Sequence, residues 1–251
     1  MKGAFFQKPL EFQLRVEGET WHQGNPVHGT LEVKNHGSEP FPLVNARIEL
    51  ALGGLKKVRE KVPGAFRPIA ALPWEGSAVL APGESASFSW SFQTDRNCPI
   101  TDTGHSLFLL YVAGDAPEKM GQLQLAFQPD AIVLEFLKTL SIQFRFVKKT
   151  QKSTKDHVET KLSPPDSKNF SMLEYLFLLT RFEGDELGLR YRFQVKKVKP
   201  TPGSPEVAKD KKEIEQRLGS AQYLQPSGRI NFDAFENAIR EALLEIDPKG
   251  T

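Results

Sequence analysis

Residues 81–93 read APGESASFSWSFQ and carry the clearest strand pattern in the chain. The stretch opens with Ala81-Pro82-Gly83-Glu84, which is typical of a tight turn because proline presets its own φ and glycine accepts unusual backbone conformations. After the turn, apolar and polar residues alternate strictly. The apolar positions are Ala86, Phe88, Trp90 and Phe92, and a serine precedes each of them. A period of two is that of a strand with one buried face, so we predict an antiparallel strand here.

The same pattern recurs on both sides of this strand. Segments that alternate, or that are apolar on both faces, lie at residues 10–17, 27–33, 44–52, 106–113 and 122–127, and a short strand is expected at 56–61. Glycine, proline and asparagine separate the segments, as they do at turns. Together they make seven or eight short strands at the spacing of an antiparallel sandwich. We therefore predict an all-β domain over residues 1–128.

The second half continues the β pattern less regularly. Strands are predicted at residues 132–136, 140–146 and 187–195 and near Val158. Residues 171–180 are apolar on all sides, so a buried strand and a short helix both fit, and we favour the strand. These segments predict a second β unit over residues 129–200. The three prolines within residues 199–205 predict a linker at its end.

The last segment, residues 201–251, changes period and is predicted to be a helical tail packed on the second unit. Residues 206–218 are charged and could form a helix that Gly219 ends. A second helix is predicted over residues 231–246, with Asn231 as its N-cap and Asp233 in its first turn. Its apolar stripe consists of Phe232, Phe235, Ile239, Ala242, Leu243 and Ile246. Such a stripe docks on its own domain or lies in a partner's groove.

The composition limits the class of protein. The 251 residues suit one large domain or two smaller ones, and the formal net charge of +2 is too small to indicate nucleic-acid binding. The single cysteine, Cys98, excludes an intramolecular disulfide, which suits a reducing compartment. No apolar run is long enough for a signal peptide or a membrane span. We therefore expect a cytoplasmic protein.

Residues that could carry catalysis or bind a metal are scattered. No nucleophile elbow, phosphate-binding loop or glycine fingerprint is present, and no spacing of histidines supports a metal site. Residues 183–186 read EGDE, which indicates a turn between strands better than a calcium site. Cys98 precedes a proline in a loop. We expect no enzyme activity, no cofactor and no metal. The histidines are His22, His28, His36, His105 and His157.

Two clusters of lysines are the candidate binding residues. The first contains Lys148, Lys149, Lys152, Lys155 and Lys161, and the second contains Lys196, Lys197 and Lys199. No aromatic residue lies between the lysines of the first cluster, which argues against nucleic acid as the partner. If the clusters share one face, they could contact an acidic protein or anionic lipid; otherwise they are solvated loops.

The first half resembles the amino-terminal domain of arrestin-like proteins, a group that includes the bacterial sporulation-control family. Three pieces carry the resemblance: Gly24-Asn25-Pro26 followed by VHGTLEV at residues 27–33; the strand at 44–52 that runs into Gly53; and LAPGE at residues 80–84 followed by Phe88, Trp90 and Phe92, then Pro99, then LLYV at residues 109–112. The order and spacing of the pieces match over residues 10–127. The family usually has Pro-Gly-Glu where this chain has Gly24-Asn25-Pro26.

This resemblance implies tandem β-sandwiches and a non-catalytic scaffold. Members of the family bind partner proteins through the faces of the sandwiches or by adding a strand to an exposed sheet edge, and the free N–H and C=O groups of an edge strand allow this. The expected partners are therefore proteins. Contact with an anionic membrane, binding of a small ligand through the two lysine clusters, and homo-oligomerisation stay open as alternatives.

Overall fold

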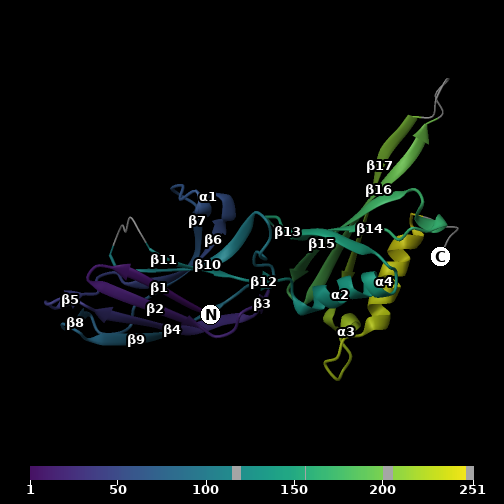
Figure 1. Cartoon of the computed structure of the whole chain (residues 1–251). Coiled ribbons are helices and arrows are strands. Elements are labelled where there is room, and N and C mark those ends of the chain that lie inside the picture. The colour runs from purple at the N-terminus through teal and green to yellow at the C-terminus, as the bar shows by residue number, and fades with distance from the viewer. Residues whose placement is uncertain (115–119, 156, 200–205, 247–251) are drawn as a thin grey trace. The chain divides into compact units, whose positions relative to one another are not determined.

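The computed structural model describes residues 1–114, 120–155, 157–199 and 206–246. The chain is mostly β and divides into two compact units, Met1–Gln128 and Pro129–Thr251 (Figure 1). The boundary lies where the sequence pattern placed it. Each unit is described by itself.

The first unit contains twelve strands and one short helix among its described residues. They are β1 (Lys2–Gln7), β2 (Leu10–Val16), β3 (Trp21–His22), β4 (Pro26–Asn35), β5 (Phe41–Pro42), β6 (Arg47–Gly54), α1 (Leu55–Arg59), β7 (Phe66–Pro73), β8 (Val79–Leu80), β9 (Ser85–Gln93), β10 (His105–Val112), β11 (Gly121–Leu125) and β12 (Phe127–Gln128).

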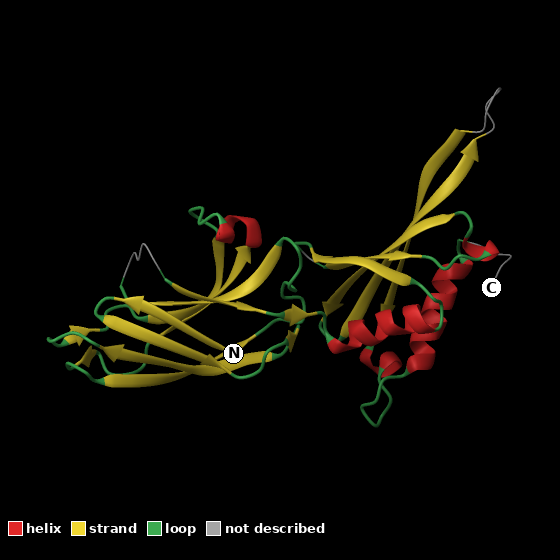
Figure 2. Ribbon diagram, viewed as in Figure 1, coloured by secondary structure: helices red, strands yellow, loops and turns green. Residues whose placement is uncertain are grey.

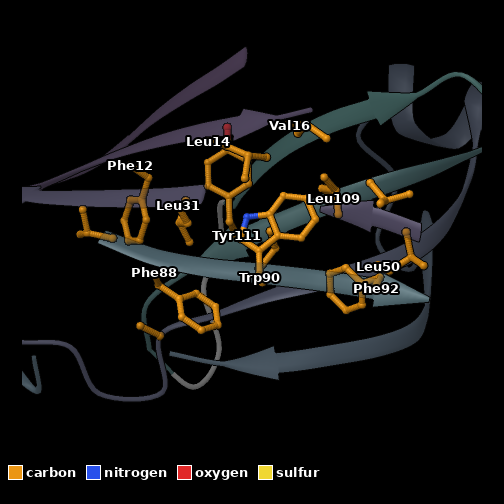
Figure 3. Packing of buried hydrophobic residues seen from close by; sticks show 14 of the residues in the cluster. Phe12, Leu14, Val16, Leu31, Leu50, Phe88, Trp90, Phe92, Leu109 and Tyr111 are labelled. Carbon is orange, nitrogen blue, oxygen red and sulfur yellow. The ribbon is translucent and has the colours of Figure 1, made fainter. Parts of the chain in front are cut away.

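Two sheets in the order β1-β2-β4-β9 and β11-β10-β6-β7 form a sandwich, with the small pairs β5-β8 and β12-β3 beside it. All pairs in the two larger sheets are antiparallel. Their inward residues form one core, in which Phe12 and Leu31 from one sheet meet Leu109 and Tyr111 from the other (Figure 3). Trp90 packs into the centre of this core. The sandwich predicted for residues 1–128 is therefore confirmed.

The strand predicted after the turn at residues 81–84 is β9, which pairs along its whole length with β4. Its four serines are exposed, and Phe88, Trp90 and Phe92 are buried. The alternation of the sequence thus translates directly into one core face and one solvent face.

Two boundaries in this unit differ from the sequence prediction. The strand predicted at 44–52 begins only at Arg47, because Asn45 adopts a positive φ of 50° that breaks the extended backbone. The short strand predicted at 56–61 is wrong, since residues 56–59 belong to helix α1 and residues 60–61 form a turn. Leu55 and Val58 of α1 cover a small apolar cluster on the outer face of the sheet, and a helix places both on one side.

The second unit contains five strands and three α-helices among its described residues. They are α2 (Ala131–Ile142), β13 (Val147–Ser153), β14 (Val158–Ser163), the 3-10 turn Lys168–Phe170, β15 (Leu173–Glu183), β16 (Glu186–Lys199), β17 (Glu206–Leu218), α3 (Ser220–Tyr223) and α4 (Phe232–Leu244). The strands form one antiparallel sheet in the order β13-β14-β15-β16-β17. Helices α2 and α4 cover one of its faces (Figure 2).

This arrangement corrects the expectation of a second sandwich. The first layer of the second unit is a sheet, as predicted, and its second layer is helical in the described residues. Residues 171–180 lie mostly in β15, as favoured, and the strands predicted near Val158 and at 187–195 are β14 and part of β16. The linker predicted at residues 199–205 lies, apart from Lys199 at the end of β16, outside the described residues.

The strands predicted at 132–136 and 140–146 are wrong, because most of this stretch is α2. The side chain of Asp130 accepts a hydrogen bond from the N–H of Ile132 at 2.8 Å, which caps the helix. Val133, Phe136 and Leu140 are buried against the sheet. Their spacing of three and four residues is that of a helix. Apolar residues of this stretch also alternate locally with polar ones, and this alternation led to the wrong prediction of strands.

The helix predicted at 206–218 is also wrong, because this segment is the edge strand β17. It pairs with β16 over its full length. Its glutamates find cross-strand partners, since Glu213 bonds Arg192 at 2.5 Å and Glu215 bonds Arg190 at 2.6 Å. The helix predicted at 231–246 is confirmed as α4, and its apolar stripe packs in the core of its own unit except for Phe232, which is exposed. Asn231 precedes α4 but bonds the carbonyl of Gln222 instead of capping the helix.

Candidate functional site

The first lysine cluster lies mainly on β13, an edge strand of the five-stranded sheet, and on its neighbour β14. Two of these lysines are engaged within the sheet. Lys152 Nζ lies 3.0 Å from Glu159 Oε1. Lys161 Nζ lies 3.5 Å from the centre of the Tyr175 ring, which is a cation–π contact. The positive charge of this segment is therefore partly compensated by its own neighbours.

The remaining lysines of the two clusters do not converge on one strand. Lys148, Lys149, Lys155 and Lys196 are exposed. Lys196 lies on β16, and the strands β14 and β15 separate it from β13. The side chains of Lys197 and Lys199 lie outside the described part of the chain. Four exposed ammonium groups thus face solvent without forming a compact patch.

The histidines also stay apart. His28 Nε2 lies 2.9 Å from Glu17, and His36 Nε2 lies 2.6 Å from Glu11, in two separate surface pairs. His105 Nδ1 lies 3.9 Å from Asp102. His22 is in β3 and His157 precedes β14. No group of three or more potential metal ligands occurs in residues 1–114, 120–155, 157–199 and 206–246.

The acidic segment at residues 183–186 forms the turn between β15 and β16, as predicted, with a positive φ of 60° at Gly184. Glu183 and Glu186 face each other across the turn, and both lie close to Arg217 Nη1, at 2.8 and 3.8 Å. Burial raises the pKa of the Cys98 thiol to about 11, so the thiol is protonated at neutral pH and is a poor nucleophile.

The strand edges of the sandwich differ in their capacity to accept another strand. β7, at the end of one sheet, contains Pro68 and Pro73. The N–H of Trp74 bonds Ala46 O and the carbonyl of Ala65 accepts from Gly54 N, both in the direction of β6. Because backbone groups alternate along a strand, both prolines lie at positions directed away from β6. They remove N–H donors from this edge and so protect it.

β9, at the end of the other sheet, has no such protection. It is nine residues long, pairs with β4 without a register shift and contains no proline and no charged residue. No strand within the described ranges pairs with its other side. This edge escaped the sequence analysis, because the uncharged run of alternating serines without proline does not say that β9 lies at the end of its sheet.

Two hydrogen bonds of β4 show which residues of β9 direct their backbone N–H and C=O groups toward β4 and which direct them toward the free edge. The carbonyl of His28 accepts from Glu17 N at 3.0 Å, toward β2, and Asn35 N donates to Glu84 O at 2.9 Å, toward β9. Alternation then directs Gly29 and Leu31 toward β9, where they face Trp90 and Phe88. The N–H and C=O groups that remain for the free edge are those of Ser85, Ser87, Ser89 and Ser91.

The other edges of the described sheets are less open. β13 has a register shift between Lys148 and Thr150, and four of the seven residues of β13 are lysine or glutamine. β17 is rich in charge throughout. Bulges and charged side chains both discourage strand addition. β1 is tied to the opposite sheet, because the side chain of Gln7 donates to Ala113 O at 2.7 Å.

The chain resembles a solved structure over nearly its whole length. That structure is the crystal structure of Spo0M, the sporulation control protein from Bacillus subtilis, with a TM-score of 0.68 at 14% sequence identity over 95% of this chain and 99% of that chain. At this identity the likeness shows the fold alone. The first unit has the arrestin-like sandwich that residues 10–127 indicated.

Two further structures show weaker likenesses. The alkylpurine DNA glycosylase AlkC from Pseudomonas fluorescens, bound to DNA, has a TM-score of 0.32 at 11% identity over 48% of this chain and 30% of that chain. The C-terminal domain of wzt has a TM-score of 0.31 at 10% identity over 51% of this chain and 79% of that chain. No protein-family model matches the sequence. No curated protein matches it either. Within the described residues, no helix is both long and apolar enough to cross a membrane.

Proposed function

We propose that this chain is a non-catalytic, cytoplasmic adaptor that binds an extended segment of a partner protein as an additional strand beside β9. The observation that carries the proposal is the free edge of β9, with the backbone groups of Ser85, Ser87, Ser89 and Ser91 directed outward. The Spo0M protein, which has this fold, is named for control of sporulation rather than for a reaction, and this supports a binding role.

The energetics of strand addition suit this edge. Each backbone hydrogen bond contributes about 1 kcal/mol net, so four or more bonds in register give useful affinity before any side chain contributes. The serine side chains are small and uncharged and leave the approach to the backbone open. The rings of Trp74 and Phe88 have centres 5.7 Å apart, and Trp74 is partly buried beside the buried Phe88 at this flank of the core. Apolar side chains of the added strand would extend that packing.

A proline substitution tests the proposal. The Ser89→Pro variant removes one outward N–H and leaves the ladder with β4 unbroken, because residue 89 does not bond β4. The matched control Ser89→Ala keeps the N–H and removes only the hydroxyl. Partners captured from a native lysate by the wild-type chain are identified, purified and titrated against each variant. We expect at least a tenfold loss of affinity for Ser89→Pro and wild-type affinity for Ser89→Ala. Equal binding by all three proteins would contradict the proposal.

A second candidate is contact with anionic lipid. It rests on the exposed ammonium groups of Lys148, Lys149, Lys155 and Lys196, none of which pairs with a carboxylate in the described structure. Flotation with vesicles of anionic and of neutral lipid, at low and high salt, tests it. Salt-sensitive binding to the anionic vesicles that disappears when the four lysines are changed to glutamine supports the candidate, and absence of flotation rejects it.

A further inference from the structure

A hollow of about 280 Å³ lies on the face of the five-stranded sheet that the helices do not cover. Its centre is a cross-strand row formed by Arg181 of β15, Gly188 of β16 and Arg217 of β17. The neighbouring row of Phe182, Leu187 and Leu218 is buried in the helical core, which places the first row on the opposite face. The hollow therefore belongs entirely to the second unit and is separate from β9.

Gly188 leaves the middle of this hollow without a side chain. Its φ is not positive, and a Cβ at this position would meet only the carbonyl oxygen of Arg181, at 3.3 Å. Glycine inside a strand costs about 0.5–1 kcal/mol relative to alanine. A glycine inside a strand often marks a place where a ligand or another backbone comes close.

The charges around Gly188 are unevenly paired. Arg190 bonds Glu215 at 2.6 Å, so these two residues satisfy each other. Arg217 is shared by the two glutamates at the β15–β16 turn, at 2.8 and 3.8 Å. Arg181 has no carboxylate within ion-pairing distance among the described residues. The hollow thus holds one unmatched guanidinium, and it holds two carboxylates that compete for one arginine.

We propose that this hollow binds a small zwitterion of the α-amino-acid type. The ligand's carboxylate would accept hydrogen bonds from Arg181, whose planar fork matches a carboxylate. Its ammonium group would donate to Glu183 or Glu186, and its side chain would lie over Leu179 and the backbone of Gly188. Three arginines and three glutamates line the hollow, so its formal charge is balanced, and a ligand carrying both charges can pair with Arg181 and with a turn glutamate at once. The volume suits a molecule at the small end of bound ligands.

An NMR titration of the full chain tests this site. L-leucine is added, and the amide resonances of Arg181, Gly188 and Arg217 are followed. N-acetyl-leucine supplies the carboxylate without the charged amine, and leucinamide supplies the amine without the carboxylate. We expect saturable shifts with leucine and at least tenfold weaker binding of both analogues. Shifts that stay linear and unsaturated with leucine, or equally tight binding of either analogue, would overturn the proposal.

Three variants locate the binding. Arg181→Gln is expected to weaken leucine binding at least tenfold. Gly188→Thr fills the hollow with a residue that strands favour, so it should abolish the saturable shifts, and a cooperative thermal transition shows that the variant is folded. Arg192→Gln is the matched control, because Arg192 lies on β16 like Gly188, on the same face of the sheet as Arg181, and outside the hollow. Wild-type binding by Arg181→Gln or Gly188→Thr would overturn the proposal. None of these residues belongs to β9, so the outcome is independent of the adaptor proposal.

Discussion

Gly29 lies directly opposite Trp90 in the ladder between β4 and β9, and the indole ring occupies the space that a side chain at residue 29 would need. A Cβ there would lie 2.9 Å from Trp90 Cζ2 and 2.0 Å from the carbonyl oxygen of Arg15. The larger residue on β9 therefore fits only because its partner on β4 has no side chain.

The Gly29→Ala substitution should lower the free energy of unfolding of the sandwich by about 3 kcal/mol, because backbone at 2.0 Å must shift to make room. Chemical denaturation followed by tryptophan fluorescence measures the change. Gly54→Ala is the matched control in the same unit, since its Cβ would meet only Cδ of the flexible Lys57 side chain, at 3.9 Å. A loss no larger at Gly29 than at Gly54 would show that the β4–β9 packing differs from this description.

Two buried tyrosines of the second unit should respond to loss of the hydroxyl with opposite signs. The Tyr191 hydroxyl has no hydrogen-bond partner in the described structure, and burial raises its pKa far above the ordinary value. The Tyr223 hydroxyl donates to Asp185 O at 2.7 Å. Tyr191→Phe should therefore raise the free energy of unfolding by about 1 kcal/mol, and Tyr223→Phe should lower it by about 1 kcal/mol. Urea denaturation measures the free energy of unfolding of both variants. Destabilisation by Tyr191→Phe would show that the Tyr191 hydroxyl has a hydrogen-bond partner.

Cys98 should be nearly inert toward thiol reagents in the folded protein at pH 8. Burial raises its pKa to about 11, so the thiolate fraction stays small and increases only as the pH approaches that value. Reaction with a chromogenic disulfide reagent measures the rate across this pH range, and the urea-unfolded chain provides the reference. Equal rates for folded and unfolded protein at pH 8 would refute the burial of this thiol.

The fold was predictable where one face of a strand is buried. In β9 the alternation of serine with Phe88, Trp90 and Phe92 leaves no second interpretation. The prediction failed where the apolar pattern fits both a strand and a helix. In α2 the apolar residues alternate locally, but the buried ones are Val133, Phe136 and Leu140, at helical spacing. The prediction also failed in β17, because charged residues on both faces resemble an exposed helix until their partners on β16 are known.

Neither proposed site could be derived from the sequence, for a physical reason. The free edge of β9 depends on strand order, and a strand pattern does not say which of its sides remains unpaired. The hollow depends on register, since Arg181, Gly188 and Arg217 become neighbours only through the pairing of three strands. The lysines could be named individually, but the compensation of Lys152 by Glu159 and of Lys161 by Tyr175 requires the same cross-strand pairing.

Amide hydrogen exchange of β9, in the free chain and with its partner bound, tests the adaptor proposal most directly. Residue-resolved NMR exchange is required, because neighbouring amides should behave differently. In the free chain the N–H of Trp90, directed toward β4, should exchange slowly, and those of Ser87 and Ser89, directed toward the free edge, should exchange fast. Strand addition predicts strong protection of Ser87 and Ser89 in the complex with Trp90 unchanged. A partner that binds tightly while Ser87 and Ser89 exchange as fast as before would contradict the account.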